Sequence, residues 1–170
     1  AGQLRNKETI VAKARLIRAW AYRHLTYSWG DVPLSTEEIT GLNYRTDWER
    51  TPVAQIREVM EADWLYAIEK LPMRQASNSD VSAALARHYL GELYLAMGKP
   101  SEAEEVLRPL VTGSEYELMT ERFGSNASQD GNAFIDVFRS PLYSQGNREV
   151  ILAFLNTEPE NSAYGTADLY

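Results

Sequence analysis

The chain has 170 residues and a net charge of −7, from 17 Lys and Arg against 24 Asp and Glu. This balance argues against a nucleic-acid partner, because phosphate binding depends on clustered basic side chains. The chain contains no cysteine, which excludes disulfides, thiol nucleophiles and thiolate metal sites.

A first helix is predicted over residues 10–29, with residues 1–9 frayed. Its apolar stripe recurs every three or four residues: Ile10, Ala14, Ile17, Ala21, Leu25 and Ser28. Gly30 ends this helix. The residues after it are expected to be extended, because Pro33 keeps Val32 out of the α region.

Residues 35–50 show no helical or strand period and are predicted to form a loop, with at most one short turn of helix. A second helix should then open at Thr51 and Pro52, with Thr51 as its N-cap and Pro52 at its first helical position. Pro72 is expected to close it.

The third helix is predicted over roughly 80–97, capped by Ser79 or Asp80, and the fourth over about 101–112. Their sequence matches one tetratricopeptide repeat, a helical hairpin. Gly91 would allow close helix approach and Gly98 would end the third helix with positive φ. The matching positions are Leu90, Gly91, Tyr94, Gly98, Ala103, Leu107 and Leu110.

These elements make the chain mainly α, with two tetratricopeptide-like hairpins that pack side by side. We expect residues 10–72 to form a divergent repeat with an inserted loop, and residues 80–112 to form a regular repeat. Residues 113–170 should hold a loop, a short helix at 133–138 and a buried β-strand at 149–155. A lone strand needs a partner, so the chain looks like part of a larger domain, here a single partial domain.

The order of four blocks resembles the SusD/RagB family of outer-membrane glycan-binding lipoproteins. They are residues 12–34, which end in Gly-Asp-Val-Pro-Leu; 50–72, with Asp63-Trp64 and Leu71-Pro72; the repeat at 82–110; and 147–154, which begin with Asn-Arg-Glu-Val-Ile. Family members are about three times as long. The resemblance therefore implies an internal segment with a SusD-like fold.

The resemblance also implies a function. It suggests a non-catalytic protein that captures an oligosaccharide or polysaccharide and passes it to a SusC-like TonB-dependent outer-membrane transporter. Such a protein would be surface-exposed and lipid-anchored through an N-terminal Cys absent from this segment, and it would need no cofactor. The alternative is a generic tetratricopeptide scaffold for protein–protein interactions, since repeats of this kind are scaffolds.

The ligand-binding candidates are Tyr44, Arg45 and Trp48, which lie with Asp47 in the loop. Sugar sites place an aromatic face against the C–H face of a pyranose, and Arg or Asp hydrogen-bonds the hydroxyls. Two other interpretations remain open. In one, Trp48 packs onto the second helix as a hydrophobic staple. In the other, the loop only supports a tetratricopeptide surface that faces the transporter.

No catalytic or metal site is predicted. His24 and His88 lie mid-helix in different hairpins, without a second ligand at metal-binding spacing. Glu102, Glu104 and Glu105 are expected to form a solvated helix face, with Glu104 supporting Arg108 four residues later. The sequence therefore indicates binding and not hydrolysis.

Overall fold

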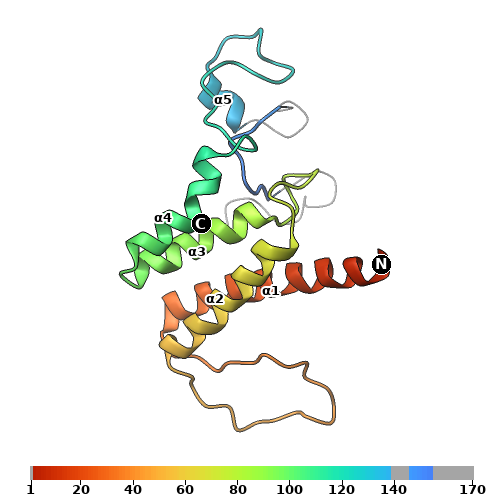
Figure 1. Ribbon diagram of the computed structural model, residues 1–170, viewed down its shortest axis with the longest axis vertical. Coiled ribbons are helices and arrows are strands. Elements are labelled where there is room, and N and C mark those ends of the chain that lie inside the picture. Colours follow the sequence, from red (N-terminus) through yellow and green to blue (C-terminus); the bar gives the residue numbers. More distant parts are fainter. Residues whose placement is uncertain (1, 139–145, 155–170) are drawn as a thin grey trace.

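The structure, a computed structural model, describes residues 2–138 and 146–154, and within them the chain is helical (Figure 1). The helices are α1 (Gly2–Trp29), α2 (Val53–Lys70), α3 (Ala83–Ala96), α4 (Pro100–Thr112) and α5 (Ala133–Val137). The mainly α prediction is confirmed. None of these described helices is both long and apolar enough to span a bilayer.

The four long helices form two neighbouring hairpins. Helix α2 packs against both α1 and α3, and α4 packs against α3. Bulky side chains of α2, including Ile56, Met60 and Trp64, are almost fully buried in the core that these helices share. The predicted side-by-side packing of the hairpins is confirmed.

Helix α1 buries a different face from the one predicted, and it begins at Gly2 where residues 1–9 were expected to fray. Ile10 and Ile17, from the predicted stripe, are 59% and 51% exposed. The buried stripe is Ala12, Leu16, Ala19, Tyr22 and Thr26. Both stripes have helical spacing, but the buried one has small alanines in the same core cluster as the large side chains of α2. Periodicity alone could not distinguish the two stripes.

The α3–α4 hairpin has the packing that its repeat pattern predicts. A Cβ on Gly91 would lie 2.6 Å from Cγ of Leu107, so the leucine of α4 packs directly on this glycine. Gly98 has a φ of +71°, the left-handed conformation that ends helices at glycine. Ala103 is buried in the same cluster as Leu90.

Both predicted N-caps are wrong: the N-cap of α2 is Pro52, one residue after Thr51, and the N-cap of α3 lies two or three residues after the predicted ones. Helix α2 begins at Val53, whose amide donates to Oδ1 of Asp31 at 2.9 Å, while Thr51 forms an isolated antiparallel bridge with Val32. Helix α3 is capped by Ser82, whose side chain accepts from the amide of Leu85 at 3.3 Å. Asp80, a predicted cap of α3, instead pairs with Lys13 of α1.

A structured loop follows α4 and leads into α5. The Arg122 guanidinium pairs with the fully buried Asp136 and also donates to the carbonyls of Asn126 (2.8 Å) and Gln129 (2.6 Å). Asn132 caps the short helix by accepting from the amide of Ile135. The predicted short helix at 133–138 is confirmed.

The predicted strand at 149–155 is wrong for residues 149–154, and Leu155 lies outside the described residues. This segment joins the core through the side chains of Ile151 and Leu152 and through one backbone bond, from the amide of Ala153 to the carbonyl of Asn78 (2.8 Å). Its apolar run reflects this packing, because no described segment pairs with it as a second strand.

Arg74, in the α2–α3 connection, ties the C-terminal segment to the hairpins. Its Nη2 donates to the carbonyl of Asn147 at 2.6 Å and its Nη1 to the carbonyl of Glu115 at 2.8 Å. The Asn147 side chain is itself buried and accepts from the amides of Glu149 and Val150. One guanidinium therefore joins three distant stretches of chain.

Candidate functional site

The loop of residues 35–50 leaves the bundle after α1, extends away from the helices and returns at the start of α2 (Figure 1). Its base is closed by the bridge, where the amide of Thr51 donates to the carbonyl of Val32 at 2.9 Å. The buried Tyr22 of α1 also holds the base, because its hydroxyl accepts from the amide of Ser35 at 2.7 Å. Residues 36–50 are all exposed. The loop thus has a base that is held at Ser35 and Thr51, and a solvated tip formed by residues 36–50.

A single asparagine organises the first half of this tip. The Asn43 side chain accepts from the amide of Thr40 and donates to the carbonyl of Glu38 at 2.7 Å. Such side-chain bonds to nearby backbone replace the hydrogen bonds that a helix would have made. The short helical turn that the sequence allowed here does not form.

The structure brings together Arg45, Asp47 and Trp48 in the second half of the tip. Nε of Arg45 donates to Oδ1 of Asp47 at 3.1 Å, and its guanidinium carbon lies 4.8 Å from the centre of the Trp48 ring. The hydrogen bond from Arg45 lowers the pKa of the Asp47 carboxyl. Tyr44 is 73% exposed.

Trp48 remains 36% exposed and is not among the described side chains packed in or against the core. This position gives no support to the staple interpretation. The Arg45 guanidinium covers one face of the indole, in a cation–π contact. Around the Trp48 ring the loop presents an aromatic surface, the N–H donors of the Arg45 guanidinium and the carboxylate oxygens of Asp47 as acceptors.

The contacts of the two histidines and of Glu104 in α4 are those of structural residues. The His24 ring packs edge-on against Trp20, and Nε2 of His88 lies 3.6 Å from Glu92. Glu104 pairs with Arg108 at 2.7 Å on an exposed face, as the spacing predicts. Among the described residues, no three His, Asp or Glu side chains come together in a way that could hold a metal ion.

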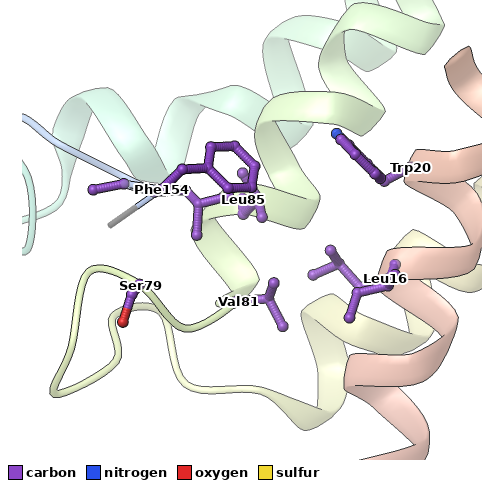
Figure 2. Close-up of a pocket in the computed structure, with 9 residues that line it drawn as sticks. Leu16, Trp20, Ser79, Val81, Leu85 and Phe154 are labelled. Atoms are coloured by element: carbon purple, nitrogen blue, oxygen red, sulfur yellow. The ribbon is translucent and has the colours of Figure 1, made fainter. Parts of the chain in front are cut away.

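An apolar hollow lies between α1 and the start of α3. Figure 2 shows Leu16 and Trp20 of α1 facing Val81, Leu85 and Phe154 around one hollow, which has a volume of about 210 Å³. Its lining is almost entirely apolar. It suits an aliphatic or aromatic group better than the hydroxyl-rich edge of a sugar, because buried hydroxyls need hydrogen-bond partners.

Comparison with known proteins relates this architecture to one group. No family model matches the chain. SusD-like protein P2 of Formosa agariphila is 33% identical over 96 residues, which cover 56% of this chain. The fold also matches a SusD-like protein from Bacteroides fragilis, with a TM-score of 0.69 and 16% identity over 91% of this chain. The chain has the SusD-like fold.

Two further solved structures with this fold are of proteins that bind glycans. One was determined with a xylogluco-oligosaccharide and matches 88% of this chain with a TM-score of 0.70 and 23% identity. The other is a laminarin-binding SusD-like protein that matches 69% of this chain with a TM-score of 0.63 and 23% identity. The SusD-like resemblance predicted from the four sequence blocks is confirmed.

The chain spans only part of these SusD-like proteins. It covers 19% of protein P2, 28% of the Bacteroides fragilis chain, 29% of the xylogluco-oligosaccharide chain and 27% of the laminarin-binding chain. Sequence reasoning located the loop of this SusD-like segment but missed the apolar hollow. The signal was present in the apolar run 149–155, which was interpreted as a strand and which contributes Leu152, Ala153 and Phe154 to the lining of the hollow.

Proposed function

We propose that this chain is part of a non-catalytic, glycan-binding component of a TonB-dependent outer-membrane uptake system. The observation that carries the proposal is the SusD-like fold, shared with a protein solved with a xylogluco-oligosaccharide and with a laminarin-binding protein. Both ligands are neutral sugars. A site for them needs aromatic faces and hydrogen-bonding groups, and needs no metal or nucleophile.

The loop tip has this chemistry, and we place the glycan contact at Tyr44, Arg45 and Trp48. Arg45 lies over one face of Trp48, so the opposite indole face is the one offered to a pyranose ring. The Arg45–Asp47 pair presents N–H donors and carboxylate acceptors beside it. Tyr44 adds a second exposed ring with a hydroxyl.

The same proposal includes the protein's setting. We place it at the cell surface, lipid-anchored in the outer membrane, with a SusC-like TonB-dependent transporter as its partner and no nucleic-acid partner. The support is the resemblance to SusD-like proteins. In this arrangement residues 10–72 and 80–112 are two repeats of one partial domain, which also includes residues 113–170.

Isothermal titration with xyloglucan and laminarin oligosaccharides tests the loop. Trp48→Ala should weaken glycan binding by roughly three- to tenfold, the loss expected for one aromatic contact. Trp29→Ala is the matched control, because Trp29 is also an exposed tryptophan but lies at the end of α1, outside the loop. Unchanged affinity in a folded Trp48→Ala protein would remove the loop from the site and favour a purely supporting role.

The same samples test the absence of catalysis. Prolonged incubation with each polysaccharide should release no reducing ends above those of a buffer blank. Release that copurifies with the protein through successive columns would contradict a purely binding role.

The alternative function is a tetratricopeptide scaffold for other proteins. The specific observation in its favour is the apolar hollow of α1 and α3, which fits a side chain better than a sugar. No affinity for either glycan, in protein that is folded by circular dichroism, would favour this alternative.

A further inference from the structure

The buried Asp63 of α2 organises a basic cluster beneath the loop base. Asp63 is only 2% exposed, and both of its oxygens accept from one arginine of α1. Nε of Arg18 donates to Oδ2 at 2.8 Å and Nη2 donates to Oδ1 at 2.7 Å. This is the two-point geometry that a planar guanidinium makes with a carboxylate.

The remaining nitrogen of Arg18 points toward the loop. Nη1 donates to the carbonyl of Thr36 at 3.2 Å, while the other two nitrogens hold Asp63. Because a guanidinium is rigid and planar, the position of Asp63 fixes the direction of this third donor. The carbonyl that it holds lies at the first fully exposed residue of the loop.

Stability alone is a poor explanation for this arrangement. Taking the Asp63 carboxylate out of water costs free energy that its attraction to the partly exposed Arg18 often fails to recover, so the pair is weak evidence of a stabilising role. Side-chain bonds to backbone, in contrast, set geometry. Arg18 and Tyr22 lie one helical turn apart on α1 and hold Thr36 and Ser35, which are consecutive loop residues.

We propose that Arg18, fixed by Asp63, is a positioning residue for the loop of residues 35–50. It sets the direction in which the loop leaves the helices, and thereby where Tyr44, Arg45 and Trp48 stand. The expected change in glycan affinity rests on the function proposed above. The expected change in how well the loop of residues 35–50 is ordered does not.

Arg15 provides a matched control on the same helix. Its Nε lies 4.0 Å from Oδ1 of the same Asp63, and its guanidinium stacks over Tyr66 of α2 at 4.4 Å. Arg15 therefore pairs with the same carboxylate as Arg18, but both contacts of Arg15 are with residues of α2 and not with the loop. Replacing it perturbs the charge around Asp63 and leaves the bond to Thr36 in place.

Amide hydrogen exchange, read by mass spectrometry on the purified protein, tests the proposal with Arg18→Lys, Arg18→Met and Arg15→Met. In both Arg18 variants, peptides from 35–50 should exchange about three- to tenfold faster, the effect of losing one ordinary solvent-exposed hydrogen bond. Peptides from α3 should be unchanged in the Arg18 variants, and Arg15→Met should match the wild type in the peptides from 35–50.

Arg18→Lys keeps the test decisive if Arg18→Met fails to fold, because an ammonium retains the charge that Asp63 needs but lacks the planar fork. Unchanged loop exchange in folded Arg18→Lys would overturn the proposal, as would equal acceleration in Arg15→Met. Glycan titration of the same variants separates the two ideas. Faster loop exchange with unchanged affinity supports the positioning of the loop and contradicts the loop as glycan site.

Discussion

Tyr94 of α3 donates its phenolic hydrogen to Oε1 of Glu61 on α2, at 2.8 Å. Burial, reinforced by this hydrogen bond to a carboxylate, raises the pKa of Tyr94 to about 12. The folded protein therefore holds the phenolic proton more tightly than the unfolded chain, whose tyrosines titrate near pH 10. This contribution to stability is complete below pH 10 and is lost as the pH rises from about 10 to about 12.

The test is the free energy of unfolding in urea at pH 8 and pH 11. Between these values the wild type should lose roughly 1 kcal/mol more than Tyr94→Phe, because phenylalanine has no proton to release. Lysine titration affects both proteins alike, so the difference between them isolates Tyr94. Parallel losses in the two proteins would show that Tyr94 titrates normally in the folded state.

The limits of sequence reasoning are clearest at single residues. Ser79, Asp80 and Ser82 are all acceptable N-caps by type, and only Ser82 caps α3. Asp31, which receives the first amide of α2, is 22 residues away from Val53 and has no local signature. The Arg18–Asp63 pair joins residues 45 apart. Contacts of this kind depend on how the helices are placed in space.

At the scale of elements, Gly91 lies where Leu107 of α4 packs directly on α3. Gly91→Leu should destabilise the protein by ~1–3 kcal/mol, because the new side chain would overlap Leu107. Urea unfolding measures the effect. The double variant Gly91→Leu/Leu107→Ala should recover part of it, since removing the leucine clears the space. Strictly additive losses would show that the two residues do not share this contact.

The helices themselves could be predicted because their ends carry strong local signals. Pro52, Pro72 and Gly98 lie next to helix boundaries, and the repeat spacing defined the α3–α4 hairpin. The candidate site was only partly accessible in the same way. The composition of the loop indicated Tyr44, Arg45 and Trp48, but the stacking of Arg45 on Trp48 and the clamped loop base are three-dimensional facts.

For the whole molecule, the two apolar stripes of α1 give a direct test of which face carries the core. Leu16→Ala should cost ~2–5 kcal/mol, because Leu16 is 1% exposed and its removal leaves a cavity. Ile17→Ala, its neighbour on the exposed stripe, should cost less than about 1 kcal/mol. Thermal or urea unfolding of the two variants measures both, and the reverse ranking would restore the stripe predicted from the sequence.

The hydrogen bonds from Arg74 to the carbonyls of Glu115 and Asn147 have a consequence for the order in which the chain folds. Contacts within the α3–α4 hairpin, such as that between Gly91 and Leu107, join residues close in sequence and can form quickly. The bonds from Arg74 to Glu115 and Asn147 span 41 and 73 residues, so the chain must close large loops, at an entropic cost, before either bond is made. We therefore expect residues 146–154 to order after the α3–α4 hairpin has formed. Until then Ile151 and Leu152, which end against the core, stay exposed to water and to neighbouring chains.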